Sequence, residues 1–275
     1  MELNQMYRNC EKILQAVREK KPIVHHITNY VTVQDCANSV LALGGSPIMA
    51  DAQEELSDIV QLSNALVINI GTLNERTRSS MYKASQFAQE RRIPIVLDPV
   101  GAGASLYRTE TVQQLIARAV PTVIRGNLSE IRNVAQLSSH TSGVDASNLD
   151  DSQYMEQTVE LAHDLASKLG CVIAITGKTD IVTDGKTHIL IENGHPLLTR
   201  VTGTGCMSTA LIGTCCAITH DALSAAVTAL LCMGIAGEVA SAHLGLGAFH
   251  AALFDAISNL DGPMLKKMGK IHVRY

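Results

Sequence analysis

The residues with the clearest chemical potential stand at 201–209, where the sequence reads VTGTGCMST. Gly203 and Gly205 precede an apolar, small-residue segment that predicts a buried helix. Glycine lets a backbone turn sharply and approach a ligand closely, and the amides at a helix N-terminus bind anions well. The same helix dipole is expected to lower the pKa of the Cys206 thiol. The segment therefore predicts a turn that holds an anion beside a reactive side chain.

Two other segments supply acidic and basic groups. Asp98 follows an apolar run and precedes PVGAG, a position that suits a hard cation such as Mg²⁺ or its water shell; a turn-capping role is the alternative. Arg125 and Glu130 belong to the sequence RGNLSE, which again ends an apolar run. The guanidinium fork matches phosphate, and Glu130 would face the place that Asp98 reaches. Asn127 and Glu130 also fit a helix capping box, so a purely structural role for this pair stays open.

Several short patterns resemble nucleotide-binding motifs only in part. The Gly-Lys pairs at 177–178 and 185–186 lack the upstream glycine of a Walker A loop, and the Gly-x-Gly at 203–205 lacks the third glycine of a dinucleotide fingerprint. Thr176 and Gly177 are still expected to contact a phosphate, through a hydroxyl and a backbone N–H. The motifs therefore predict phosphate binding without a P-loop or a Rossmann site.

The elements that must position these residues alternate between two kinds. Apolar, strand-like runs separated by helical segments predict a parallel sheet covered on both faces. In such a sheet ligands bind beyond the carboxyl ends of the strands, so polar residues that follow the strands should converge on one crevice. The strand-like runs lie at residues 22–28, 66–70, 95–97, 122–124 and 171–175, the helical segments at 3–20, 37–43, 74–90, 109–119, 129–137 and 152–169. Two buried helices are expected within 206–243, an antiparallel edge hairpin within 180–191, and a long loop at 138–151.

Composition limits the class of protein. The 275 residues, 46% hydrophobic and 17% charged, suit one α/β domain over residues 1–275. A net charge of -4, 3% aromatic residues and no Trp argue against a nucleic-acid partner. We find no signal-peptide pattern and no uncharged apolar run of ~20 residues, so no membrane association is expected. Seven cysteines without a C-x-x-C pair indicate a reducing cytoplasm.

Six blocks of sequence together resemble one known family, the hydroxyethylthiazole kinases. They occur in the family's order over about residues 20 to 260, which makes the resemblance more specific than any single short motif. The blocks are VHHITN at 24–29, LALGGSPIM at 41–49, NIGT at 69–72, LDPVGAG at 97–103, RGN at 125–127 and VTGTGC at 201–206.

The resemblance implies a ribokinase-like α/β fold, with a mostly parallel central sheet, helices on both faces and an antiparallel edge hairpin. It also implies ATP-dependent phosphorylation of the primary hydroxyl of 4-methyl-5-(2-hydroxyethyl)thiazole in thiamine salvage, with Mg²⁺, by a homotrimer whose active sites lie between subunits. By position, Asn29, Met49 and Gly203 match substrate-contacting residues, Met49 from across the interface; Arg125 and Thr176 match nucleotide-binding residues, Asp98 and Glu130 the metal-handling acids, and Cys206 the residue that faces the substrate hydroxyl.

One position separates this chain from most of the wider ribokinase superfamily, which carries Asp where Cys206 stands. Cysteine there resembles the thiazole kinase branch, with Cys206 as a modest proton acceptor. Three other functions stay open from the residues. They are a kinase for a related pyrimidine alcohol, a Cys206-dependent acyl-transfer enzyme that would need His25 or His26 as its base, and a non-catalytic nucleotide-binding regulator.

Overall fold

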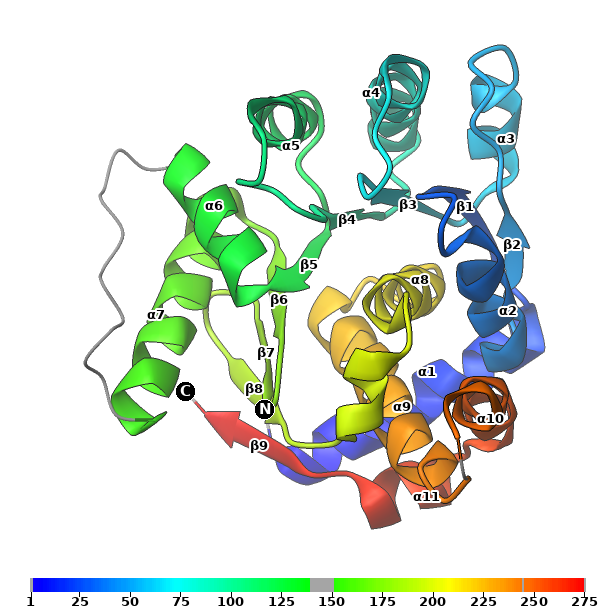
Figure 1. Ribbon diagram of the computed structural model, residues 1–275, viewed down its shortest axis with the longest axis vertical. Helices are drawn as coiled ribbons and strands as arrows, with labels where there is room; N and C mark the ends of the chain where they lie inside the picture. The colour runs from blue at the N-terminus through cyan, green and yellow to red at the C-terminus, as the bar shows by residue number, and fades with distance from the viewer. Residues whose placement is uncertain (1, 139–150, 244, 275) are drawn as a thin grey trace.

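The computed structural model describes residues 2–138, 151–243 and 245–274, so the loop expected at 138–151 lies almost wholly outside the described residues. A nine-stranded sheet in the order β2-β1-β3-β4-β5-β6-β7-β8-β9 runs through this part of the chain (Figure 1). The strands from β2 to β6 are parallel, and β6 to β9 pair antiparallel. The strands are β1 (Ile23–Ile27), β2 (Ser46–Ile48), β3 (Ala65–Asn69), β4 (Ile95–Asp98), β5 (Val123–Asn127), β6 (Val172–Thr176), β7 (Asp180–Thr183), β8 (His188–Ile191) and β9 (Ile271–Arg274).

Helices cover both faces of this sheet, as the alternating pattern predicted (Figure 1). Along β3, Ala65 and Val67 belong to one core and Leu66 and Ile68 to the other, because successive side chains of a strand point to opposite faces. The helices on one face are α3 (Leu56–Leu62), α4 (Glu75–Glu90), α5 (Leu106–Arg118), α6 (Leu128–Ser138) and α7 (Asp151–Leu169). Those on the other are α1 (Leu3–Lys20), α2 (Val33–Leu43), α8 (Thr204–Cys216), α9 (Ala222–Ala240), α10 (Leu246–Asn259) and α11 (Gly262–Met268), with a short 3-10 helix η1 (Pro196–Arg200).

The two expected buried helices are α8 and α9. Gly213 lets α8 lie directly on the sheet, since a Cβ there would stand 2.3 Å from Val67 Cγ2. By length and composition alone α9 would also be able to cross a membrane, but 83% of its most apolar window is buried inside the protein. Its hydrophobic surface is therefore used by the core of this fold.

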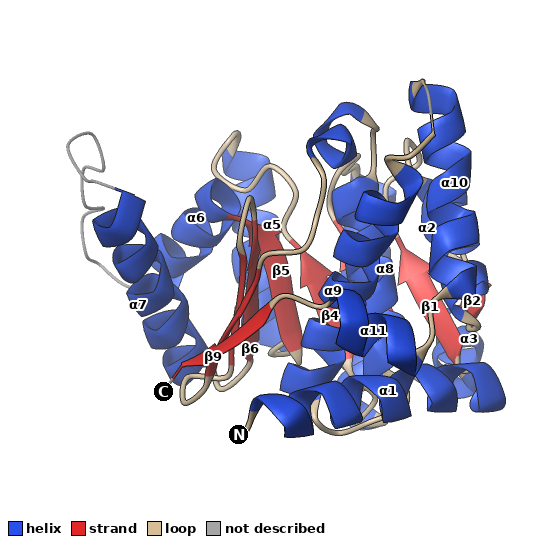
Figure 2. Cartoon of the chain, turned by 90° about the horizontal axis from the view of Figure 1, so that it is seen from below, coloured by secondary structure: helices blue, strands red, loops and turns tan. Residues whose placement is uncertain are grey.

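The antiparallel edge is one strand wider than the sequence predicted. The hairpin β7–β8 forms as expected, and the C-terminal strand β9 then pairs with β8 from His188 opposite Arg274 to Ile191 opposite Ile271. Figure 2 shows β9 and β2 at opposite ends of the sheet. The chain after the Gly-rich turn also differs from the prediction: Gly44 ends α2 with a φ of 113°, and Ser46–Ile48 then pairs with β1 as the other edge strand.

Candidate active site

The carboxyl ends of the parallel strands bring polar side chains from distant segments together. Asn29 follows β1, Asn69 ends β3, Asp98 ends β4, Arg125 lies in β5 and Thr176 ends β6. Hydrogen bonds or ion pairs link each of these residues to another member of the row, and the N-terminal turn of α8 lies against them.

Asp98 is the fully buried centre of this group. Its Oδ2 accepts hydrogen bonds from Asn69 Nδ2 and Thr209 Oγ1, both at 2.8 Å, and Arg125 Nη1 lies 3.6 Å from the same oxygen. Burial raises the pKa of Asp98 to about 6, although the Arg125 charge opposes that rise. The second oxygen, Oδ1, is buried and has no hydrogen-bond partner among the described residues. A buried acceptor without a donor is suited to a cation or its bound water.

Cys206 lies in the first turn of α8 and is held by two amides. Its Sγ accepts hydrogen bonds from Asn29 Nδ2 and Asn69 Nδ2, each at 3.3 Å. Burial raises the pKa of the Cys206 thiol, and the nearby Asp98 carboxylate raises it further. The lowered pKa expected from the helix dipole is therefore wrong, because loss of solvent and a neighbouring negative charge both disfavour the thiolate. Cys206 is a thiol at neutral pH.

The two glycines of the turn serve different purposes. Gly203 precedes α8 with a φ of 92°, and a Cβ there would stand 2.6 Å from Thr32 Cγ2. Gly205 lies under Arg125, since its Cβ would stand 2.7 Å from Arg125 Nη1. The first amides of α8 and the Arg125 guanidinium therefore share one small region, where both favour an anion.

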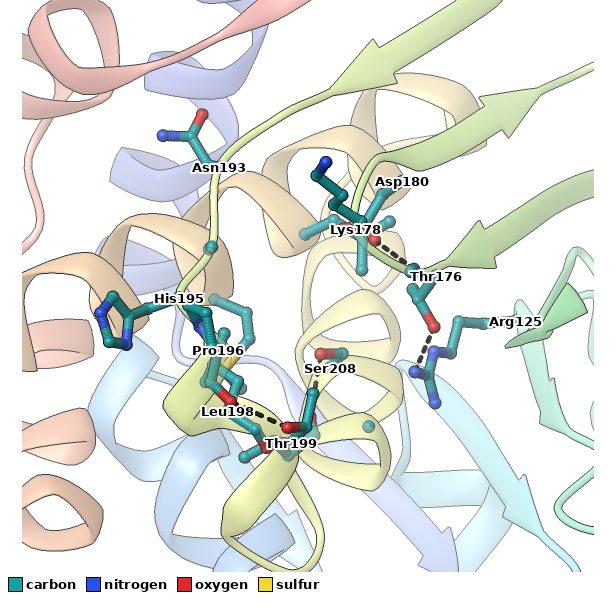
Figure 3. A pocket seen from close by; sticks show the side chains of 17 residues that line it. Arg125, Thr176, Lys178, Asp180, Asn193, His195, Pro196, Leu198, Thr199 and Ser208 are labelled. Carbon is teal, nitrogen blue, oxygen red and sulfur yellow. Dashed lines mark hydrogen bonds between the residues drawn. The ribbon is translucent and has the colours of Figure 1, made fainter. Parts of the chain in front are cut away.

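Arg125 also donates a hydrogen bond to Thr176 Oγ1, as Figure 3 shows. These two residues, predicted to bind nucleotide, thus lie side by side. The amide of Gly177, predicted to contact phosphate as well, already donates to Asp180 Oδ1 at 2.9 Å. Burial raises the pKa of Asp180 to about 6.

A cavity of about 470 Å³ opens beside Arg125 and the first turn of α8 (Figure 3). This volume falls within the range of small-molecule sites. One part of its wall is polar or cationic, from Arg125, Thr176 and Lys178, and another is apolar. The remaining lining residues are Gly177, Asp180, Asn193, Gly194, His195, Pro196, Leu198, Thr199, Thr204, Gly205, Ser208, Leu230, Met233 and Gly234.

Glu130 forms the capping box that the sequence offered as its structural alternative. Its Oε2 accepts from Asn127 N at 2.8 Å, and Glu130 N donates to Asn127 Oδ1 at 2.9 Å. Its Oε1 accepts from Gly101 N at 2.9 Å, which ties the loop after β4 to the start of α6. Both carboxylate oxygens thus already accept from backbone amides, which leaves each only part of its acceptor capacity for a metal or its water.

Met49 follows edge strand β2, at the far end of the same row from the cavity. It is partly buried and packs against the core.

The two histidines of β1, His25 and His26, do not pair with Cys206. His25 Nε2 bonds to the Ala50 carbonyl at 2.7 Å, and within the part of the chain that the structure describes His25 Nδ1 and both ring nitrogens of His26 have no hydrogen-bond partner. Burial lowers the pKa of His26 to about 3, so it stays neutral.

Magnesium would have few protein ligands here. Within residues 2–138, 151–243 and 245–274 no three His, Cys, Asp or Glu side chains are grouped to hold a metal ion. Mg²⁺ commonly binds one or two carboxylates and keeps waters and substrate phosphates as its other ligands. The unpartnered Oδ1 of Asp98, beside an anion-binding turn, fits that mode.

The sequence did not predict the roles of Asn69 and Thr209 in holding the site residues. Asn69 joins three site residues, because its Nδ2 contacts both Asp98 and Cys206 and its Oδ1 accepts from Asn29. Its position at a strand end was the available signal. Thr209 stands three residues after Cys206, on the same face of α8, and only the packing of α8 on β4 shows its contact with Asp98.

Comparison with known proteins identifies the family. The model of the hydroxyethylthiazole kinase family matches residues 14–262. This chain belongs to the hydroxyethylthiazole kinase family. A hydroxyethylthiazole kinase of Clostridium beijerinckii is 50% identical over 271 residues, 98% of each chain, and one of Methanocorpusculum labreanum is 43% identical over 94% of this chain and 97% of its own. The resemblance seen in the six sequence blocks is confirmed.

Solved structures agree with this assignment. The hydroxyethylthiazole kinase of Pyrococcus horikoshii OT3 is 38% identical and superposes with a TM-score of 0.89 over 98% of this chain and 100% of that one. A ribokinase-like superfamily protein of Enterococcus faecalis, 13% identical, matches with a TM-score of 0.64 over 92% of this chain and 95% of that one. The latter shares the fold alone, and the predicted ribokinase-like fold is confirmed.

Proposed function

We propose that this protein transfers the γ-phosphoryl group of ATP to the primary hydroxyl of 4-methyl-5-(2-hydroxyethyl)thiazole, a step of thiamine salvage. The observation that carries the proposal is the meeting of Arg125, the first turn of α8, Asp98 and Cys206 at one edge of the sheet. This group combines cationic, amide and carboxylate chemistry around one point, in a chain that belongs to the thiazole kinase family.

ATP would occupy the 470 Å³ cavity. Its phosphates would lie toward Arg125, Thr176 and the amides of α8, where positive charge collects. Its base would lie toward the apolar wall that Leu198, Leu230 and Met233 supply. Contact with the Gly177 amide would require that amide to leave Asp180.

The thiazole would bind on the other side of Cys206, against Asn29 and Gly203. Met49 would complete this pocket from the neighbouring subunit of a homotrimer, which its position at the outer edge of the sheet supports. The seven cysteines are all free thiols, which supports a cytoplasmic location.

Magnesium, when bound, would neutralise charge on the phosphates. Asp98 would hold it through the unpartnered Oδ1, directly or through water, and Glu130 would act at longer range, since its oxygens bind Gly101 and Asn127 amides. The remaining work belongs to this chain's own groups.

Phosphoryl transfer has a loose transition state, so positioning and charge neutralisation supply most of the acceleration. The amides of residues 203–206 and the Arg125 guanidinium would stabilise the γ-phosphoryl oxygens as charge shifts onto them. Asn29 and Asn69 hold Cys206 Sγ as an acceptor of two N–H groups. With both lone pairs of the neutral thiol engaged, the S–H group would donate toward the substrate hydroxyl oxygen and assist its orientation.

ADP release measured over a panel of alcohols tests this function. Hydroxyethylthiazole should stimulate ADP release from ATP and Mg²⁺, and a hydroxymethylpyrimidine should do so far less. Equal ADP release with the pyrimidine alcohol would indicate that the substrate is a pyrimidine alcohol as well as a thiazole alcohol. Hydrolysis of an activated ester that depends on Cys206 and needs no ATP would instead favour acyl transfer.

A further inference from the structure

One wall of the cavity rests on α9. The segment 193–199 follows β8, includes most of η1 and supplies Asn193, Gly194 and Leu198 to the cavity lining; Figure 3 labels Asn193 and Leu198. It approaches α9 at two glycines: a Cβ on Gly234 would stand 2.7 Å from Asn193 Cβ, and one on Gly237 would stand 2.7 Å from Leu198 Cδ1. The segment thus packs directly on the backbone of α9, and the interactions that hold it there determine the position of this cavity wall.

Glu238 makes that tie. It is the one Asp, Glu, Lys or Arg within Ala222–Ala240, and its side chain is only 18% exposed. A single oxygen, Oε1, accepts from Asn193 Nδ2 at 3.1 Å, from Gly194 N at 3.1 Å and from Lys270 Nζ at 2.9 Å. A charge in an otherwise apolar helix is costly unless it is paired and hydrogen-bonded, and these three donors meet that need.

Asn193 extends the tie to the C-terminal part of the chain. Its Nδ2 donates to the Met268 carbonyl at 2.9 Å as well as to Glu238, and its Oδ1 accepts from Lys270 N at 2.7 Å. The orientation of the Asn193 amide is thereby fixed, because Lys270 N requires an acceptor and Met268 O a donor. The segment is held between α9 and the entry to β9.

The same segment reaches the phosphate end of the site. Thr204 Oγ1 donates to the Leu198 carbonyl at 2.8 Å, which couples the wall to the first turn of α8. A displacement of the segment 193–199 would therefore alter the shape of the cavity next to the start of that helix. Glu238 itself does not line the cavity.

We propose that Glu238 is a positioning residue for nucleotide binding, which holds the segment 193–199 so that the cavity accepts ATP. The inference rests on the proposed function of the cavity as the ATP site. It assigns a role to a partly buried charge in the apolar segment after Cys206, which neither the phosphoryl-transfer chemistry nor the thiazole pocket uses.

Kinetics of Glu238→Ala test the proposal. The substitution leaves Gly194 N–H and one Asn193 N–H without their acceptor, so we expect the KM for ATP to rise about tenfold. We expect kcat and the KM for the thiazole to change less than about twofold, because the reacting groups stay in place. Equilibrium binding of ATP and Mg²⁺ without the thiazole should weaken by the same factor as the KM.

Two variants are matched controls. Glu238→Gln keeps an oxygen that accepts from Asn193 and Gly194, so it should restore wild-type ATP binding. Lys270→Ala removes the exposed ammonium contact alone and should leave ATP binding within about twofold of the wild type, as expected of a surface ion pair. Glu238→Ala and Glu238→Gln behaving alike would contradict the role of the acceptor.

Gly234→Ala tests the same wall if Glu238→Ala does not fold. The added methyl group would press on Asn193, and ATP binding should again weaken selectively. Unchanged ATP binding in folded Glu238→Ala or Gly234→Ala, or an equal loss of thiazole binding, would overturn the inference. Failure of the wild-type enzyme to bind ATP at all would instead contradict the proposed function of the cavity.

Discussion

The two protonation states of Asp98 serve different ends: the ionised form suits cation binding, and the protonated form favours the folded state. Its pKa is raised from 3.8 to about 6, so the folded protein holds the proton more tightly than the unfolded chain. The protonated carboxyl therefore contributes stability that is fully present below pH 4 and is lost as the pH rises through about 6. At neutral pH Asp98 is ionised, as cation binding needs, and the fold carries the cost.

Asp98→Asn should expose this conflict. Without nucleotide or metal, its free energy of unfolding at pH 8 should exceed that of the wild type by on the order of 3 kcal/mol, and by less at pH 5. Its kcat should fall at least about a hundredfold, because the carboxylate that would hold Mg²⁺ near the phosphates is gone. Urea denaturation at the two pH values, with assays of the same samples, provides the measurement. A stability difference independent of pH would contradict the raised pKa.

Cys206 should assist catalysis without controlling its rate. The pKa of its thiol is raised, so little thiolate exists at neutral pH to act as a base. Cys206→Ser should keep kcat within about tenfold of the wild type, below the usual contribution of an essential general base. Cys206→Asp, which restores the acid of the wider superfamily, should keep or raise kcat. If both variants fold and neither turns over, the sulfur is essential and this account of Cys206 is wrong.

Residue types predicted much of the candidate site. Asp98, Arg125 and Thr176 follow apolar runs, and parallel strands deliver such positions to one edge. Asn69 shares that signal, but its hydrogen bonds to Asp98 and Cys206, like the tie made by Glu238, depend on contacts between segments far apart in the sequence. The sign of the Cys206 pKa shift was also beyond prediction, because burial and the distance to Asp98 exist only after folding.

At the scale of elements, the two glycines at the start of α8 have different functions: Gly203 adopts a positive φ, and Gly205 leaves room for Arg125. Gly203→Ala should cost about 1 to 2 kcal/mol of stability, because its φ of 92° strains any other residue and its methyl group meets Thr32. Gly205→Ala should leave stability nearly unchanged, since the group that it meets is the flexible end of Arg125. It should raise the KM for ATP instead by displacing the guanidinium. Thermal unfolding and ATP kinetics of both variants check this; equal destabilisation would contradict it.

Elements with strong periodicity were predicted, and those without it were not. The parallel strands from β1 to β6 are apolar runs, apart from the short edge strand β2, where Pro47 reads as part of a turn. The C-terminal strand, Ile271–Arg274, alternates too briefly to be recognised, and it forms because β8 offers an unpaired edge. The sequence therefore predicted an antiparallel edge with the hairpin β7–β8, but not the additional strand β9.

At the scale of the whole molecule, Met49 and Asp98 should act from different chains. Met49→Arg and Asp98→Asn should each be inactive alone, and co-expression should restore activity. In mixed assemblies of the proposed homotrimer, some sites would combine a native Met49 from one chain with a native Asp98 from its neighbour. Activity of co-purified mixtures checks the prediction, with separately purified variants mixed without subunit exchange as the control. Mixed assemblies as inactive as their parents would contradict a shared site.

We propose that the protein transfers the γ-phosphoryl group of ATP to a thiazole alcohol and that the turn before α8 binds this group. The most direct test of this proposal is the product of purified enzyme with ATP, Mg²⁺ and 4-methyl-5-(2-hydroxyethyl)thiazole, identified by mass spectrometry and quantified against ADP. The account predicts thiazole phosphate and ADP in equal amounts, with neither formed when the alcohol is left out. ADP formed without thiazole phosphate, or no ADP that depends on the alcohol, would contradict it.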